Sequence, residues 1–302
     1  MRYLLGLFCL LSSIHIYAQP RHITVDGTKI WVKTLGTEDR KPGQPVIVFE
    51  NGHGVPLDNW DKVVDDVAAL APVVAYDRAG IGQSEAVDEK PTMENVANRL
   101  VRILQVLELE PPYVLVGHSL GGMYVRGFPM YYPDLLAGLV IVDPADFTET
   151  HENKRDYYTV LNWEEQKVDS LIQHFIDRRN RGHDKELTPV GREGQYLEEV
   201  RAAEFKEIME HQLPNIPVHM ITGGRFDMPE KFRSKDYDHE ALFRSKIKHR
   251  SSRWIDVIQT VDKGMFFYSG DAGHYVQWDD PGLVVASIKL VLSDYEVLKQ
   301  KK

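Results

Sequence analysis

The stretch YVLVGHSLGG, residues 113–122, constrains the fold of this chain more than any other segment. Tyr113 to Val116 form a short apolar run that predicts a strand buried on both faces. Leu120 to Tyr132 follow with helical composition. The G-x-S-x-G turn between them would force Ser119 into a strained backbone conformation, with glycines on either side because a Cβ there would crowd the crossing of strand and helix. The Ser119 hydroxyl would then stand above the sheet edge, at a helix N-terminus.

The motif alone is a weak signal, because a chain of this length contains it by chance roughly one time in ten. An ordinary glycine-rich turn is the alternative interpretation. The context strengthens it, since apolar runs alternate with helical segments along the chain, which predicts a parallel sheet with right-handed crossovers. The expected strands are 22–25, 29–35, 45–49, 73–76, 113–116, 139–142, 217–222 and 265–269, and the expected helices include 57–70, 92–109, 120–132 and about 281–298.

The alternation breaks after Asp143-Pro144, because residues 145–214 are charged and helical without a convincing strand. We interpret this region as a helical cap inserted over the sheet edge. The predicted organisation is therefore a segment 1–18, a first core part 19–144, the cap 145–214 and a second core part 215–302.

The first 18 residues have the composition of a secretory signal peptide. Arg2 precedes the short apolar run Leu4 to Leu11, and small residues lead to Ala18. The run is too short for a convincing membrane span, so we expect cleavage after Ala18, export, and no stable membrane anchor. Cys9, the single cysteine, lies within this segment, which leaves the mature chain without a thiol nucleophile, thiolate metal site or disulfide.

Charge and composition exclude several classes of partner. The chain has 302 residues, 43% of them hydrophobic, and a formal net charge of −9, which argues against nucleic acid as the main partner. The 12 histidines show no ligand spacing that makes a metal site credible. We expect neither a metal nor a cofactor; the oligomeric state stays open.

A serine hydroxyl needs a base to take its proton, and the base needs an orienting acid. His274 follows the strand 265–269 in a glycine-containing loop and is the candidate base. Asp227, which follows the strand 217–222, is the favoured acid because its strand should neighbour the one that delivers His274. Asp143, at the end of the strand 139–142, is the alternative, although Asp-Pro more often forms a turn or cap.

The candidate donors to an oxyanion are the backbone N–H groups of Leu120, at the start of the helix, and of His53, after Gly52. The side chain of His118 should point away from Ser119 and pack structurally. For His53 we favour a backbone role, with a pocket-lining side chain as the alternative.

These segments together resemble the α/β-hydrolases of the lipase, esterase and haloperoxidase-like superfamily over nearly all of the chain after residue 18. The resemblance implies an α/β-hydrolase fold, a mostly parallel central sheet with flanking helices and a cap. Ser119 occupies the elbow position where epoxide hydrolases and haloalkane dehalogenases carry aspartate, so those activities are not expected. The matching segments are 117–122 as nucleophile elbow, 51–54 as oxyanion loop, 76–84 as a structural loop, and 223–227 and 273–274 as acid and histidine loops.

Three functions follow from this resemblance and the candidate residues. The first is a serine hydrolase that cleaves a carboxylic ester or lactone of a small molecule, with a bulky macrolide-like lactone as one candidate substrate. The second is a proline iminopeptidase-like aminopeptidase, which would need a cap carboxylate such as Glu149, Glu152 or Glu164. The third is a non-catalytic ligand-binding module. A cap suggests a covered apolar pocket, for which Phe147 and Trp163 are candidate lining residues.

Overall fold

A computed structural model describes residues 19–183 and 188–301. The proposed signal peptide, with its cut after Ala18, lies outside the described residues, so export stays a prediction. In the part of the chain that is described, no helix has both the length and the apolar character needed to cross a membrane.

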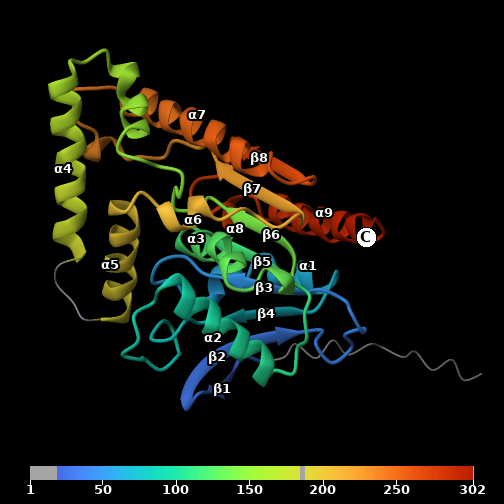
Figure 1. The fold of residues 1–302 in the computed structure, drawn as a ribbon. Helices are drawn as coiled ribbons and strands as arrows, with labels where there is room; N and C mark the ends of the chain where they lie inside the picture. The colour runs from blue at the N-terminus through green and yellow to red at the C-terminus, as the bar shows by residue number, and fades with distance from the viewer. Residues whose placement is uncertain (1–18, 184–187, 302) are drawn as a thin grey trace, which may run out of the picture.

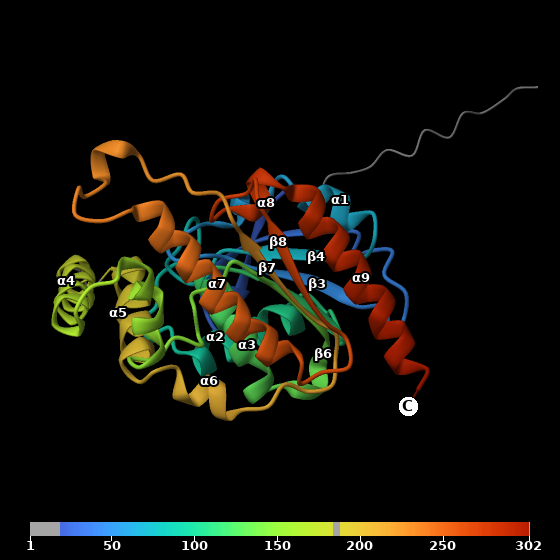
Figure 2. The ribbon, with the colours of Figure 1, turned by 90° about the horizontal axis from the view of Figure 1, so that it is seen from above.

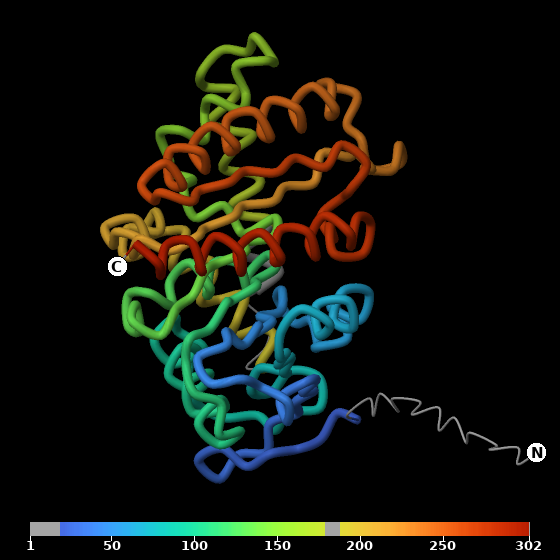
Figure 3. The backbone as a smooth tube through the Cα atoms, turned by 90° about the vertical axis from the view of Figure 1, so that its right-hand side faces the viewer, coloured from blue at the N-terminus to red at the C-terminus, as the bar shows by residue number. Residues whose placement is uncertain are grey.

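An eight-stranded sheet forms the centre of the molecule, in the order β1-β2-β4-β3-β5-β6-β7-β8. β1 and β2 pair antiparallel with each other, β2 pairs antiparallel with β4, and the remaining neighbours are parallel. This confirms the mostly parallel sheet. The N-terminal strands and the pair β7 and β8 lie at opposite ends of the sheet (Figure 3). The strands are β1 (Arg21–Val25), β2 (Thr28–Leu35), β3 (Val46–Glu50), β4 (Val73–Tyr76), β5 (Tyr113–His118), β6 (Leu136–Val142), β7 (Val218–Gly223) and β8 (Gly264–Ser269).

Helices cover both faces of the sheet (Figure 2). One apolar cluster joins the sheet to α2 (Met93–Val106), α3 (Leu120–Gly127) and α7 (His239–Ile258). The other joins it to α1 (Val64–Ala68) and α9 (Pro281–Lys299). Short elements complete the core: η1 (Leu57–Trp60), η2 (Phe128–Met130), η3 (Pro133–Leu135), η5 (Glu230–Phe232) and α8 (Val276–Asp279).

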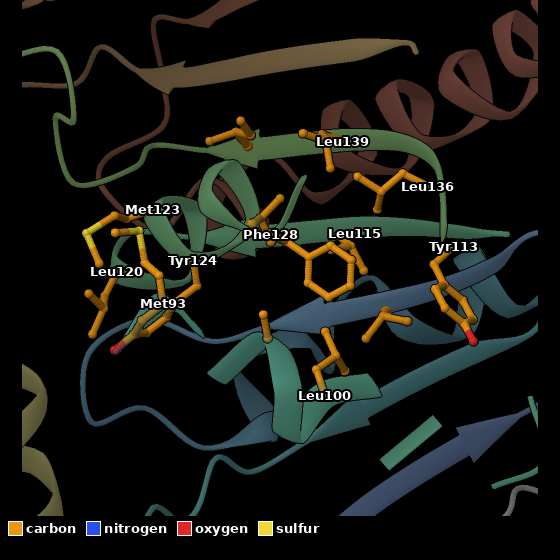
Figure 4. Close-up of a cluster of buried hydrophobic side chains, with 14 of the residues drawn as sticks. Met93, Leu100, Tyr113, Leu115, Leu120, Met123, Tyr124, Phe128, Leu136 and Leu139 are labelled. Carbon is orange, nitrogen blue, oxygen red and sulfur yellow. The ribbon is translucent and has the colours of Figure 1, made fainter. Parts of the chain in front are cut away.

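The central strands are buried on both faces, as their unbroken apolar sequence predicts. Every residue of β5 and β6 is buried. On the face covered by α2 and α3, Leu115 and Leu139 of the strands pack with Leu100 of α2 and Phe128 of η2 (Figure 4). This packing fixes the two strands whose carboxyl ends carry Ser119 and Asp143.

The predicted helix 57–70 is wrong as one continuous element. The structure has η1, a turn, and then the short α1. The carbonyl of Asn59 accepts a hydrogen bond from Trp278 Nε1 at 2.7 Å, while the N–H of Val63 bonds to Trp60 three residues back. The tertiary contact therefore takes an acceptor that a regular helix would have used.

Among the described residues between β6 and β7, all the regular elements are helices. They are η4 (Asn153–Leu161), α4 (Glu165–His183), α5 (Pro189–Ala202) and α6 (Lys206–Glu210). α4 and α5 stand beside the sheet (Figure 1). The N-terminal turn of α5 lies against the loops that follow β3 and β4, since a Cβ added to Gly54 would be 2.8 Å from Val190 Cγ1 and one added to Gly80 would be 2.4 Å from Pro189 Cγ. This helical segment falls within the predicted cap, 145–214.

Candidate active site

Ser119 occupies a sharp turn between β5 and α3, with φ 55° and ψ −116°. The crossing leaves no room for side chains on the flanking glycines. A Cβ on Gly117 would lie 2.4 Å from the carbonyl oxygen of Gly121, and a Cβ on Gly121 would lie 2.4 Å from the carbonyl oxygens of Glu50 and Asn51. The strained turn and its glycines are therefore what the sequence predicts for this segment.

His274 meets Ser119 from the loop between β8 and α8. Its Nε2 lies 3.1 Å from Ser119 Oγ. The N–H of Gly273 donates to Asp279 Oδ2 at 2.8 Å, and Arg225 Nη2 donates to the same oxygen at 2.9 Å. These contacts hold the histidine loop above the serine turn.

The carboxylate that contacts His274 belongs to Asp143, which follows β6. Asp143 Oδ2 lies 2.7 Å from His274 Nδ1, and the residue is only 5% exposed. Since a carboxylate only accepts, Nδ1 carries a proton, which leaves Nε2 as the acceptor for the Ser119 hydroxyl.

The expectation that Asp227 orients His274 is wrong. The side chain of Asp227 is 65% exposed and lies 3.6 Å from Arg225 Nη2. It comes close to the histidine loop, because a Cβ on Gly273 would be 3.0 Å from Asp227 Oδ2. The imidazole, however, points toward the end of β6, where Asp143 was the alternative.

The second oxygen of Asp143 is held by two further side chains. Oδ1 accepts hydrogen bonds from Thr222 Oγ1 at 2.8 Å and from Arg250 Nη2 at 2.6 Å. Burial alone would raise the pKa of Asp143, but the Arg250 charge and the hydrogen bonds from His274 and Thr222 outweigh it and lower the pKa. Asp143 is therefore ionised and fixed in place. Arg250 lies on α7, far from Asp143 along the chain, and no sequence motif marks it as part of the site.

His118 is buried, as expected for a residue that packs structurally. Its Nε2 lies 2.9 Å from the carbonyl oxygen of His274. A carbonyl only accepts, so Nε2 is the protonated nitrogen. Burial, with a contribution from His274, lowers the pKa of His118 to about 3, so the ring is neutral and supports the histidine loop from below.

The two expected oxyanion donors flank Ser119. Leu120 is the first residue of α3, so its N–H has no partner one turn back within the helix. Gly52 lies directly against the turn that carries Ser119, since a Cβ built on it would be 3.5 Å from Ser119 Cβ. The N–H of His53 belongs to the peptide that follows Gly52, while the His53 side chain bonds to the carbonyl of Val190 in α5, at 2.8 Å. Their role as donors stays a proposal.

Arg78 forms a buried ionic centre behind the oxyanion loop. Its guanidinium contacts Glu50 Oε1 and Glu193 Oε1, both at 2.6 Å. Burial alone would lower the pKa of Arg78, but Glu193 and Glu50 outweigh burial and raise it well above its ordinary value. Residues 76–84 were expected to form a structural loop, but the contact of Arg78 with Glu193 of α5 was not predicted.

The two residues predicted to line a substrate pocket pack against other side chains of the protein instead. Phe147 is fully buried in the main core, with Arg126 over its ring. Trp163 packs edge-on against Tyr237 beneath Lys167, beside the cluster that joins η4, α4 and α7. The side chain of His274 is 48% exposed, so this side of the site faces solvent.

No group of three or more histidine, cysteine or acidic residues within 19–183 and 188–301 is arranged to hold a metal ion.

Comparison with known proteins agrees with this architecture. The model of the alpha/beta hydrolase fold family matches residues 45–186. The uncharacterized protein YqjL of Bacillus subtilis is 32% identical over 268 residues, which cover 88% of this chain and 88% of YqjL.

Two solved structures share the fold at low sequence identity. The enol-lactonase from Burkholderia xenovorans LB400 superposes with a TM-score of 0.57 at 16% identity, over 90% of this chain and 100% of its own. A thermophilic esterase from Thermogutta terrifontis superposes with a TM-score of 0.54 at 21% identity, over 92% of this chain and 99% of its own.

Proposed function

The chain belongs to the α/β-hydrolase fold family, and from this premise we propose that it is a serine hydrolase that cleaves a carboxylic ester or lactone through an acyl-enzyme. The observation that carries the proposal is a continuous path of hydrogen bonds. It runs from Ser119 Oγ to His274 Nε2 over 3.1 Å and from His274 Nδ1 to Asp143 Oδ2 over 2.7 Å.

In the acylation step, Ser119 Oγ attacks the carbonyl carbon of the substrate while His274 Nε2 takes the hydroxyl proton. Asp143 holds the Nδ1–H and stabilises the imidazolium that forms. The developing negative charge on the carbonyl oxygen is stabilised by the N–H groups of Leu120 and His53. The tetrahedral intermediate then expels the alcohol oxygen, which receives the proton from His274.

Deacylation repeats these transfers with water in place of the serine hydroxyl. His274 Nε2 removes a proton from the water, the resulting hydroxide attacks the acyl carbon, and the proton passes to Ser119 Oγ as the acid leaves. In a lactone the alcohol remains tethered to the acyl group, so one hydroxy acid is the product.

An aminopeptidase would need a cap carboxylate to bind the amine of its substrate, and the surroundings of the three candidates favour ester or lactone cleavage instead. Glu149 is paired with Lys154 at 2.8 Å, and Glu152 and Glu164 are exposed on the cap. An esterase and an enol-lactonase are among the proteins that share the fold. The exposure of His274 supports a bulky alcohol or ring that extends into solvent, and a macrolide-like lactone is one such substrate.

The first experiment compares the wild-type enzyme with Ser119→Ala on a p-nitrophenyl ester. Loss of the nucleophile should reduce kcat by about 10⁴-fold or more while the circular dichroism spectrum is unchanged. Ser170→Ala, at an exposed serine of α4, is the matched control and should retain full activity. Undiminished turnover by Ser119→Ala would overturn the proposal.

A panel of substrates then separates the classes. Acyl esters and lactones of increasing ring size are compared with an aminoacyl arylamide, each against the Ser119→Ala background. Faster Ser119-dependent release from the arylamide than from every ester would favour the aminopeptidase alternative.

A further inference from the structure

Arg78 is anchored to the backbone of the oxyanion loop as well as to carboxylates. Nη1 donates to the carbonyl oxygen of Asn51 at 2.6 Å, and Nη2 donates to the carbonyl oxygen of Gly52 at 2.7 Å. The residue is 4% exposed, so these bonds lie away from competing water. One guanidinium therefore fixes two consecutive peptide groups next to Ser119.

The bond to the Gly52 carbonyl has a direct geometric consequence. A trans peptide is planar, so its C=O and N–H groups point in opposite directions. The N–H in this peptide belongs to His53, the proposed oxyanion donor. By holding the carbonyl of Gly52 on one side, Arg78 sets the direction of the His53 N–H on the other.

Glu193 connects this arrangement to the cap. It lies on α5, is 2% exposed, and accepts from Arg78 Nε at 2.6 Å through Oε1. Through Oε2 it accepts from the N–H of Gly54 at 2.9 Å. The same carboxylate thus orients the arginine that holds Gly52 and grips the backbone on the far side of His53.

We propose that Glu193 is a positioning residue for the oxyanion site: through Arg78 and Gly54 it fixes the peptide that presents the His53 N–H, so the cap helix α5 takes part in transition-state stabilisation. The inference rests on the proposed serine hydrolase function and adds a residue and an element that touch no reacting atom. Its consequence is that docking of α5 controls kcat.

Because Arg78 has a second carboxylate partner, we expect the positioning role of Glu193 to be testable in a folded variant. Arg78 is paired with Glu50 as well as Glu193, so loss of the Glu193 charge leaves the buried arginine with one carboxylate. A glutamine has almost the same shape as glutamate but only one oxygen, so it can accept from Arg78 or Gly54 and must place an N–H group against the other donor. Glu193→Gln therefore perturbs the loop while keeping the packing of α5.

The experiment measures kcat and KM of Glu193→Gln and Glu193→Ala with an aryl ester, beside affinity for an alkyl boronic acid, which forms a tetrahedral adduct with the serine. We expect kcat to fall roughly 10-fold for the glutamine variant and about 100-fold for the alanine variant, since loss of one oxyanion donor costs about 10²–10³-fold. Boronate affinity should fall in parallel, while KM changes by less than about 3-fold. Glu199→Gln is the matched control, because Glu199 lies on the same helix and pairs with the exposed Lys90 at the surface; it should behave as wild type.

The outcomes distinguish this inference from the function on which it rests. If the wild type shows no Ser119-dependent turnover, the proposed function fails and the inference with it. If turnover depends on Ser119 but kcat and boronate affinity of Glu193→Gln match the wild type, or KM alone rises, the inference is overturned and the function stands. Should Glu193→Ala not fold, the glutamine variant decides.

Discussion

At the scale of single residues, the orientation of His274 depends on how firmly Asp143 is held. Its two oxygens accept hydrogen bonds from His274, Thr222 and Arg250, and the arginine places a full positive charge at 2.6 Å. The Arg250 side chain is 20% exposed, which makes this a largely buried ion pair. Asp143 therefore stays ionised where burial alone would favour its neutral form.

Removing the Arg250 charge should change the pH dependence of the reaction. The arginine lowers the pKa of Asp143, so the carboxylate stays ionised to lower pH. In Arg250→Met the pKa of Asp143 therefore rises. Because the ionised carboxylate is the form that holds the Nδ1–H of His274, the acidic limb of the kcat/KM profile should move to higher pH, by roughly 0.5–1 pH unit.

The profile is measured with an aryl ester from pH 4 to 9. Arg155→Met, which removes an exposed arginine paired with Asp169 on the cap, serves as the control and should leave the limb in place. If the acidic limb of the kcat/KM profile is unchanged or moves to lower pH in Arg250→Met, the role assigned to the ion pair of Arg250 and Asp143 is contradicted.

The identity of the carboxylate that contacts His274 could not be predicted from the sequence. Ser119 and His274 follow strand ends in glycine-containing loops, and the sequence placed both at the edge where they meet. Asp143 and Asp227 follow the neighbouring strands β6 and β7, so position along the chain does not discriminate between them. What distinguishes Asp143 is its contact with Thr222 and Arg250. These contacts join residues far apart along the chain, so no local sequence pattern reveals them.

At the scale of elements, the regular strands and helices were predictable, because helices carry a periodic apolar face and buried strands are short unbroken apolar runs. Thr92 accepts from the N–H of Asn95 and caps α2, within a residue of the expected start. The break between η1 and α1 was not predictable, because Asn59 makes its deciding contacts with Gln277 and Trp278 near the other end of the chain. The contact of Arg78 with Glu193 was also not predictable, because the two residues lie far apart along the chain.

The turn from β5 to α3 is the element with the least tolerance for change. In Gly121→Ala the new Cβ would meet the carbonyl oxygens of Glu50 and Asn51 at 2.4 Å, and both belong to backbone that cannot move without shifting β3 and the oxyanion loop. We expect a loss of at least about 2 kcal/mol in the free energy of unfolding. Urea unfolding followed by circular dichroism measures it.

Gly282→Ala is the matched control for this substitution. Gly282 lies in the first turn of α9 with nothing within 4 Å of an added Cβ. Alanine there should be neutral or stabilise by up to about 1 kcal/mol. Equal stability of Gly121→Ala and the wild type would mean that the crossing is looser than the structure indicates.

At the scale of the whole molecule, the central sheet contains a histidine that must stay neutral. His219 on β7 is completely buried and bonds to Ser287 of α9 through Nδ1 at 2.9 Å. Burial lowers its pKa from 6.5 to about 4. Because the unfolded chain binds the proton first, stability is complete above pH 6.5 and is lost as the pH falls toward 4.

His219→Asn removes the titrating group while an amide can still bond to Ser287. Between pH 7 and pH 4.5 the wild type should lose roughly 2 kcal/mol more stability than this variant, since each pH unit of mismatch contributes about 1.4 kcal/mol. Urea unfolding at both pH values gives the difference. Identical pH dependence in the two proteins would show that His219 does not drive acid unfolding.

Elements that lie far apart along the chain meet at one rim of the sheet. Ser119 comes from β5, Asp143 from β6, His274 from the loop after β8, and α5 reaches the same rim through Glu193. The central claim is that this convergence activates Ser119 as a nucleophile.

Labelling with a fluorophosphonate tests that claim most directly, because Ser119 Oγ must displace fluoride from phosphorus to form a stable adduct. Intact mass and peptide mapping should place one adduct on Ser119 in the wild type and none in Ser119→Ala. The labelling rate should fall by about 10³-fold or more in Asp143→Asn and stay within about 2-fold of wild type in Asp227→Asn. An unlabelled wild type, an adduct that persists in Ser119→Ala, or a rate that depends on Asp227 and not on Asp143 would contradict the account.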